Sequence, residues 1–171
     1  MTANTNTLHA VRFLALAFTA LALMPAGAHL LELPNKLGLS ADEYLIAQRL
    51  YRGWALLGVV VIGALLSTGA LVLTLRGQAG FGAAMVALTC ILATQIVFWS
   101  TTYPVNVATH NWSMLPVHWK VLRLRWEYSH VVSAILNLAA LFATCIAVLR
   151  SSTSAPYLRP RETSAPHPRT A

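Results

Sequence analysis

The feature that most constrains this chain is a set of long apolar runs separated by short polar segments. One run, from Trp54 to Leu75, contains no charged residue and matches the ~20 apolar residues that a helix needs to cross a membrane. Charged residues make up 10% of the chain, against about 25% in an ordinary soluble domain. So few charges cannot cover a water-soluble surface of this size. The sequence therefore predicts an integral membrane protein.

Four such runs predict an all-α fold, a four-helix transmembrane bundle. We expect the spans at about residues 10–32, 53–75, 81–103 and 129–149. The short turn between the second and third spans favours antiparallel neighbours. Residues 1–9 are expected to form a short N-terminal segment and residues 10–150 the membrane domain. Residues 151–171, rich in Ser, Thr, Pro and Arg, are typical of a disordered tail.

Two helices are expected to extend beyond the membrane on one face. Ser40 and Glu43 fit a capping box, and no proline follows until after the second span, so one helix should run from there with residues 41–53 in the interface. A loop is expected over residues 104–116. The fourth helix should then begin near Pro116, because proline suits the first helical turn, and include an interfacial portion of its own.

The first apolar run has a second interpretation. Arg12, the run 13–24 and the small residues 26–28 resemble a secretory signal peptide with a cleavage site after Ala28. Cleavage there would leave three spans. We favour a retained helix because the apolar run continues through Leu31 and because three spans close a bundle poorly.

The net charge of +7 has an explanation in the membrane. The basic residues lie at the ends of the apolar runs, where anionic lipid headgroups and the positive-inside rule account for them. We therefore expect membrane lipid as a partner and no nucleic acid. An even number of spans places both termini on one side, and Lys and Arg divide equally between the two sides. We expect cytoplasmic termini, with the polar face outward.

Chemically versatile side chains gather at one predicted membrane face. They are His29, His110, His118, His130, Glu32, Asp42, Glu43, Glu127, Trp54, Trp99, Trp112, Trp119 and Trp126. An interfacial tryptophan belt should be two-sided, and the opposite face has none. A purely structural network also does not need several histidines, which titrate near neutrality. The asymmetry therefore indicates a functional site at this face.

Three predicted helices contribute matching polar stripes to that face. At helical periodicity, the fourth helix aligns Trp119, Arg123, Trp126, His130 and Asn137. The second aligns Tyr44, Gln48 and Tyr51, with Arg52 beside them, and the third aligns Gln95, Trp99 and Thr102. Polar groups inside a membrane are costly unless they face the bundle interior. We expect a pocket with aromatic walls and a polar rim that binds a lipophilic small molecule.

Two other interpretations of these residues stay open. In the first, Arg52 and Arg123 neutralise Glu32 and Glu127, and the network only holds the helices together. In the second, the face binds a metal. The pairs His29 with Glu32 and Glu127 with His130 each have a spacing of three residues, so each pair lies on one helical face, and two His and two Glu can hold one metal ion. A haem is disfavoured, since no two histidines lie mid-membrane on facing helices.

Several motifs, taken in order, resemble a known membrane family. They are Ala28-His-Leu-Leu-Glu-Leu-Pro-Asn-Lys36, Tyr51-Arg-Gly-Trp54, Tyr103-Pro-Val-Asn106, Asn111-Trp112 and Arg123-Leu-Arg-Trp-Glu-Tyr-Ser-His130. Over roughly residues 10–150 the ordered set resembles the anthrone-oxygenase-like integral membrane family, and its bacterial members in particular. Characterised fungal members of that family oxygenate an anthrone to an anthraquinone without an added cofactor. By this resemblance the functional positions are Asn106, Trp112, Arg123, Trp126 and His130.

The resemblance implies a location in the bacterial inner membrane and dioxygen chemistry on a lipophilic phenol or quinol, with no cofactor. His130 is then the predicted base, which Glu127 or Glu32 orients. Arg123 or Arg52 would stabilise developing negative charge. The predicted catalytic residues are His130, Glu127, Arg123, His29 and Glu32. The predicted substrate contacts are Tyr51, Arg52, Asn106, Trp112, Trp119, Trp126, Trp99 and Gln95. The alternative is a non-catalytic module that binds a quinone-like or lipid ligand.

Overall fold

The computed structural model describes residues 5–152, and all regular structure within that range is helical. The α-helices are α1 (Thr5–Lys36), α2 (Ala41–Gln48), α3 (Gly58–Thr74), α4 (Phe81–Val97), α5 (Tyr103–Ala108) and α6 (Trp119–Ser152). Four helical segments are long and apolar enough to cross a membrane, which confirms the predicted four-helix transmembrane bundle. Most of the expected tail, 151–171, lies outside the described residues, as do residues 1–4.

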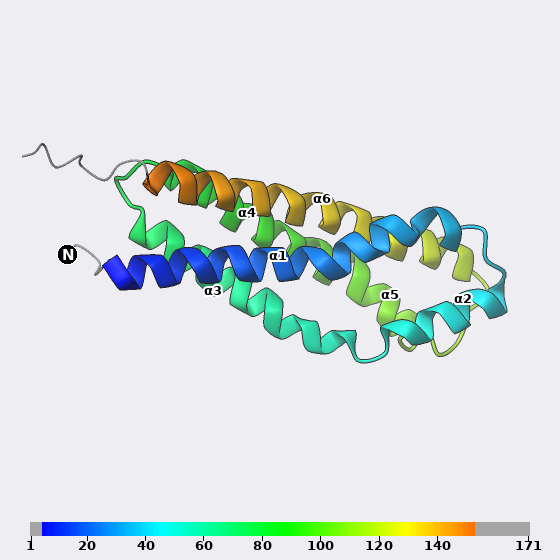
Figure 1. Ribbon diagram of the computed structural model, residues 1–171. Coiled ribbons are helices and arrows are strands. Elements are labelled where there is room, and N and C mark those ends of the chain that lie inside the picture. Colours follow the sequence, from blue (N-terminus) through cyan, green and yellow to red (C-terminus); the bar gives the residue numbers. More distant parts are fainter. Residues whose placement is uncertain (1–4, 153–171) are drawn as a thin grey trace, which may run out of the picture.

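The four long helices form a bundle in which each packs against two others. Helix α6 packs against α1 and α4, and α3 packs against α1 and α4. Helices α2 and α5 gather at one end, together with the last turns of α1 and the first turns of α6 (Figure 1). The beginning of α1 and the end of α6 lie at the opposite end. We call the end that contains α2 and α5 the polar end, and the last turns of α1 contribute residues to it. We call the opposite end, where α1 begins and α6 ends, the plain end.

Small residues allow the helices to pack closely at the plain end. Ala15, Ala84 and Ala147, from three different helices, belong to one buried cluster, as is common between membrane helices. Gly80, just before α4, has a positive φ of 95°. A Cβ atom added there would lie 2.5 Å from the carbonyl oxygen of Ala147, so only glycine fits this turn.

The expectation of one unbroken helix from Ser40 through the second span is wrong. Helix α2 ends at Gln48, a 3-10 turn covers Arg49–Tyr51, and helical structure resumes at Trp54. The break falls at Gly53, whose φ of 89° is left-handed and cannot belong to a right-handed helix.

The start of α2 is as expected: the Ser40 N–H donates to the Glu43 carboxylate at 2.9 Å. The hydrogen bond from the Ser40 hydroxyl, followed by this backbone bond, holds the pKa of Glu43 below its usual range.

The third span also differs from expectation, because helical structure continues past residue 103 to Ala108. Pro104 lies in the first turn of α5, directly after a π-helical turn, Phe98–Thr102. Proline lacks an N–H and clashes with the carbonyl four residues earlier, and the wider π-helical backbone accommodates both defects. The following loop is therefore shorter than the expected 104–116, and α6 begins at Trp119 rather than near Pro116.

Candidate functional site

Two imidazole rings stack at the polar end of the bundle. The ring centroids of His29, from α1, and His130, from α6, lie 4.1 Å apart. Trp126 presents an edge to both rings, at 4.9 Å from His29 and 4.3 Å from His130. Tyr51 and Trp54, on either side of the Gly53 break, lie 4.5 and 5.4 Å from His29. Side chains from three chain segments thus enclose the two histidines in aromatic rings.

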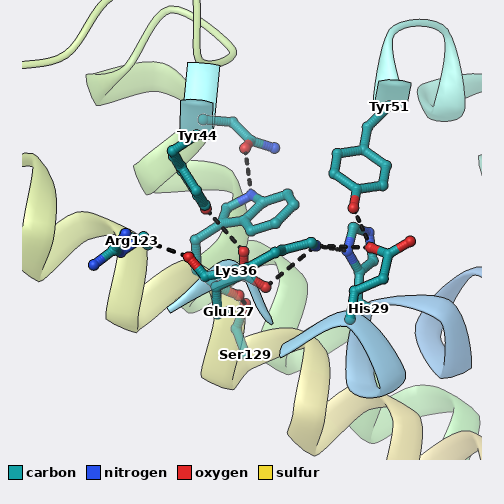
Figure 2. A network of polar contacts seen from close by, with 10 residues as sticks. His29, Lys36, Tyr44, Tyr51, Arg123, Glu127 and Ser129 are labelled. Atoms are coloured by element: carbon teal, nitrogen blue, oxygen red, sulfur yellow. Dashed lines mark hydrogen bonds and ion pairs between the residues drawn. The ribbon is translucent and has the colours of Figure 1, made fainter. Parts of the chain in front are cut away.

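A buried lysine lies at the centre of the neighbouring polar network. The Nζ atom of Lys36 lies 3.0 Å from His29 Nδ1 and 3.0 Å from Glu32 Oε2. It also lies 3.5 Å from an oxygen of Glu127, a carboxylate that is 1% exposed. Helical spacing explains the grouping, because residues 29, 32 and 36 share one face of α1. Figure 2 shows Lys36 extended between the two carboxylates and the His29 ring.

The lysine also determines which ring nitrogen of His29 carries the proton. An ammonium group has three donors and no acceptor, and Lys36 has one acceptor for each of its three N–H bonds. The Nδ1 atom of His29 must then accept, so its ring is neutral and carries its proton on Nε2. One ion therefore holds two carboxylates and one imidazole in fixed positions.

Two tyrosine hydroxyls complete this network from the other side. Tyr44, on α2, donates to Glu127 Oε1 at 2.9 Å, and Tyr51 donates to Glu32. Burial, followed by the nearby carboxylates, raises the pKa of both tyrosines. Both phenols therefore remain protonated donors, and each carboxylate is held by a lysine and a tyrosine.

Arg123 has a different role from the one expected. Its Nη1 atom donates to the backbone carbonyl of Leu39 at 2.9 Å and to that of Lys36 at 3.4 Å. Its guanidinium lies over the rings of Tyr44 and Trp119. It therefore caps carbonyls at and just after the end of α1, which have no helical partner. The interpretation that Arg52 and Arg123 neutralise the carboxylates is wrong, because Lys36 makes those ion pairs.

A cavity of about 1180 Å³ opens beside the two histidines. The predicted residues that line it are His29, His130, Tyr51, Arg52, Asn106, Trp112, Trp126, Trp99 and Gln95. The other predicted residues, Glu32, Glu127, Arg123 and Trp119, are not among its lining residues. They form the network behind the His29 wall instead. The predicted pocket is thus present. Some of the predicted residues line it, and the others form the network that supports its His29 wall.

The cavity lining includes three buried nitrogen atoms without a partner among the described residues, Gln48 Nε2, Trp112 Nε1 and His130 Nε2, and of these only the imidazole nitrogen can accept a hydrogen bond. His130 Nε2 is buried and makes no hydrogen bond to any described residue. Its neighbour Trp126 is, by contrast, fixed by a bond of 2.8 Å from its indole N–H to Asn106 Oδ1. Buried polar atoms are nearly always hydrogen-bonded, so an exception calls for an explanation. A ligand hydroxyl in the cavity is such an explanation, because it would donate to this nitrogen.

Sequence reasoning missed three residues of this site, namely Lys36, Tyr44 and Trp54, as individual candidates. Lys36 follows Glu32 by four residues and His29 by seven. That spacing was the signal available, because it places an ammonium on the same helical face as the imidazole and the carboxylate. Tyr44 was recognised only as part of a stripe.

The geometry contradicts the alternative of a metal bound by His29, Glu32, Glu127 and His130. Within the described part of the chain, no three His, Cys, Asp or Glu side chains form a group suited to a metal ion. Lys36 already directs its positive charge at three of the four proposed ligands. A second cation at the same place would be repelled.

Comparison of the chain with protein-family models, with curated proteins and with solved structures finds no match in any of the three. The anthrone-oxygenase-like resemblance therefore stays a prediction. What the fold and the site define is a class: a membrane-embedded helical bundle with an aromatic cavity at one end. Paired histidines form part of the cavity wall, and a lysine–carboxylate network supports them from behind.

Proposed function

We propose that this protein is a membrane oxidoreductase that binds a lipophilic phenol or quinol and deprotonates it for reaction with dioxygen. The observation that carries the proposal is the buried Nε2 atom of His130, which has no partner among the described residues and lies at the wall of the cavity. A neutral imidazole nitrogen of this kind accepts a hydrogen bond from a phenolic hydroxyl and then its proton.

The cavity suits a flat, apolar ligand. Its aromatic walls include Tyr51, Trp54 and Trp126, and aromatic rings bind planar ligands by stacking and edge contacts. The cavity belongs to a bundle whose outer surface is apolar, so a lipophilic substrate would be concentrated around the protein by the bilayer itself.

The network behind the histidines supports proton transfer. With both carboxylates ionised, Glu32 and Glu127 carry one more charge than the Lys36 ammonium that they share. The two carboxylates offset the positive charge of Lys36, so the imidazolium that His130 becomes when it takes a proton does not lie beside an uncompensated ammonium. Charge stabilisation on the substrate side falls to Arg52, which lines the cavity rim, because Arg123 is engaged with backbone carbonyls.

The chemistry balances without a further reactant. An anthrone-type substrate loses a proton to His130, and the resulting carbanion reduces dioxygen. Its CH₂ group becomes a carbonyl, with one oxygen atom retained and the other released as water. A quinol instead loses two electrons and two protons to dioxygen, which yields a quinone and hydrogen peroxide.

The test is oxygen uptake by purified protein in lipid vesicles supplied with an anthrone or a quinol. We expect uptake by the natural chain and at least a hundredfold loss in His130→Ala, since a positioned base contributes about 10²–10⁴-fold. His118→Ala is the matched control, because His118 is exposed at the same end and should retain full activity. Undiminished uptake in His130→Ala removes this residue as the base.

A second function, ligand binding without catalysis, is favoured by one observation. No carboxylate within residues 5–152 hydrogen-bonds either nitrogen of His130, because Glu32 and Glu127 are engaged with Lys36 and the tyrosines. A module that only binds a quinone-like or lipid ligand needs no oriented base. It predicts that His130→Ala still binds the ligand and that no phenolic substrate supports oxygen uptake.

We also infer a bacterial inner-membrane location with cytoplasmic termini and the cavity end outward. Among the described residues, all carboxylates lie toward the cavity end, whereas Arg12, Arg76 and Arg150 lie toward the other. Every described Asp, Glu, Lys or Arg residue at the plain end is thus basic, and on this basis we take that end as the cytoplasmic face.

A further inference from the structure

Two amide side chains line the cavity far inside the membrane. Asn137, on α6, is 7% exposed, and Gln95, on α4, is half-buried; both are cavity-lining residues. Strongly polar groups at this depth are costly, and they mark substrate paths when they face a cavity. Neither amide has a role in the proton transfer proposed for His130, so the presence of two amides in the cavity lining requires a separate explanation.

The hydrogen bonds of these amides orient them. Asn137 Nδ2 donates to the carbonyl of Ser133 at 2.9 Å, and Gln95 Nε2 donates to Thr94 Oγ1 at 3.1 Å. Each amide nitrogen therefore uses one of its two N–H groups within its own helix and keeps the other. Neither amide oxygen accepts a hydrogen bond from a described residue. The deep end of the cavity thus offers two amide oxygens as acceptors and two amide N–H groups as donors, a combination that suits a hydroxyl, which both donates and accepts.

The spacing along α6 relates this deep end to His130. Asn137 follows His130 by seven residues, two turns on the same face, or about 10 Å of helix axis. A ligand that donates at both positions uses about 3 Å for each hydrogen bond. Its two oxygens are then separated by roughly 4.5 Å, which is the scale of two hydroxyls on one aromatic ring.

We propose that Asn137 and Gln95 form a second recognition site for a hydroxyl group, so that the cavity selects aromatic diols (quinols) over phenols with one hydroxyl. This inference rests on the proposed function and narrows its substrate class. It also distinguishes substrate from product. Oxidation turns both hydroxyls into carbonyls, which still accept from the amide N–H groups but cannot donate to the amide oxygens or to His130 Nε2, so the quinone makes fewer hydrogen bonds, binds more weakly and leaves.

The test measures binding without turnover. Purified protein in detergent, free of oxygen, is titrated with a hydroquinone, its monomethyl ether and the corresponding quinone, and binding is followed by tryptophan fluorescence or calorimetry. We expect the diol to bind about tenfold more tightly than the ether or the quinone, since each hydrogen bond contributes a factor of about 2–10. Equal affinity of the natural chain for diol and ether overturns the inference, and this comparison needs no variant.

Two near-isosteric variants, Asn137→Leu and Gln95→Leu, locate the effect. Each is expected to remove most of the preference for the diol and to leave the affinity for the ether unchanged. Ser67→Ala, which alters a buried polar residue outside the cavity lining, is the control and should keep the preference. A preference that survives in both leucine variants contradicts the assignment. Oxygen uptake does not enter the assay, so loss of activity in His130→Ala is judged separately.

Discussion

At the scale of single residues, Lys36 has the largest consequence for the site. It is 4% exposed, and it contacts His29, Glu32 and Glu127 at once. Removing it would leave the Glu127 carboxylate buried beside a single tyrosine donor. A buried charge without its partner is strongly destabilising. The lysine therefore acts as a positioning residue that holds the His29 wall of the cavity.

We expect Lys36→Met to destabilise the protein by about 3 kcal/mol, because breaking a buried ion pair costs about 3–5 kcal/mol. Thermal unfolding in detergent, followed by circular dichroism, measures this. Lys120→Met is the control, since Lys120 is exposed on α6 and its loss should change little. Adding Glu127→Gln to Lys36→Met should recover part of the loss. A Lys36→Met protein as stable as the natural chain contradicts the network.

Tyr51 gives a prediction of pH dependence. Burial and then the Glu32 carboxylate raise its pKa above the ordinary value of about 10. Because the folded-state pKa is raised, the stabilisation from this phenol is complete below pH ~10 and is lost only as pH rises through the higher folded value. Tyr51→Phe should therefore lower stability by about 1.5–3 kcal/mol equally at pH 7 and pH 9. A difference that fades before pH 9 contradicts the raised pKa.

The residues of the site were predictable from the sequence only in part. Helical periodicity on the fourth predicted helix aligned Trp126 with His130, and the structure places both at the cavity. The role of Lys36 could not be predicted in the same way. A lysine at the end of an apolar helix usually extends its charge to the interface, and only the packing of α6 against α1 shows that this one turns inward.

At the scale of helical elements, two irregularities shape the cavity. The break at Gly53 separates Tyr51 from Trp54 while both rings contact His29. The π-helical turn Phe98–Thr102 lets the third span continue through Pro104 and bring Asn106 to Trp126. Neither irregularity was predictable from hydrophobic periodicity. Glycine and proline mark places where a helix is able to break or bend, and tertiary packing decides whether it does.

The glycines at the start of α4 test the close packing of the plain end. Gly80→Ala should destabilise by at least 2 kcal/mol, because it combines a left-handed backbone with a Cβ that would lie 2.5 Å from the Ala147 carbonyl oxygen. Gly82→Ala is the matched comparison, two residues later. It has open space around it and a helical backbone, so it should stabilise by about 0.5–1 kcal/mol. Thermal midpoints in one detergent compare the two variants. Equal effects from both contradict this packing.

At the scale of the whole molecule, the four spans were predicted well because few backbone structures are stable when lipid is the surrounding solvent. Only helices satisfy every backbone hydrogen bond within one segment in a membrane, so composition and run length determine the fold class. The gathering of histidines and tryptophans at one end was predictable for the same reason. The positions of the cavity and the lysine network depend on how the helices rotate and pack, which composition does not specify.

The proposed orientation is a property of the whole molecule and has its own test. Single cysteines replace exposed Asp42 at the cavity end or exposed Gln78 at the plain end in a chain with Cys90 and Cys145 changed to Ala. In intact bacterial cells whose outer membrane has been made permeable, a membrane-impermeant thiol reagent should label position 42 and not position 78. Labelling of position 78 alone means that the cavity end faces the cytoplasm.

The measurement that tests the central claim most directly is the absorbance spectrum of a bound chromophoric phenol in the absence of oxygen. We expect the natural chain, at a pH below the pKa of the free phenol, to shift the bound phenol to its phenolate spectrum. His130→Gln should bind the same phenol and leave it neutral, and His118→Gln should behave like the natural chain. A phenol that stays neutral in the natural chain, or that ionises equally in His130→Gln, would contradict the account.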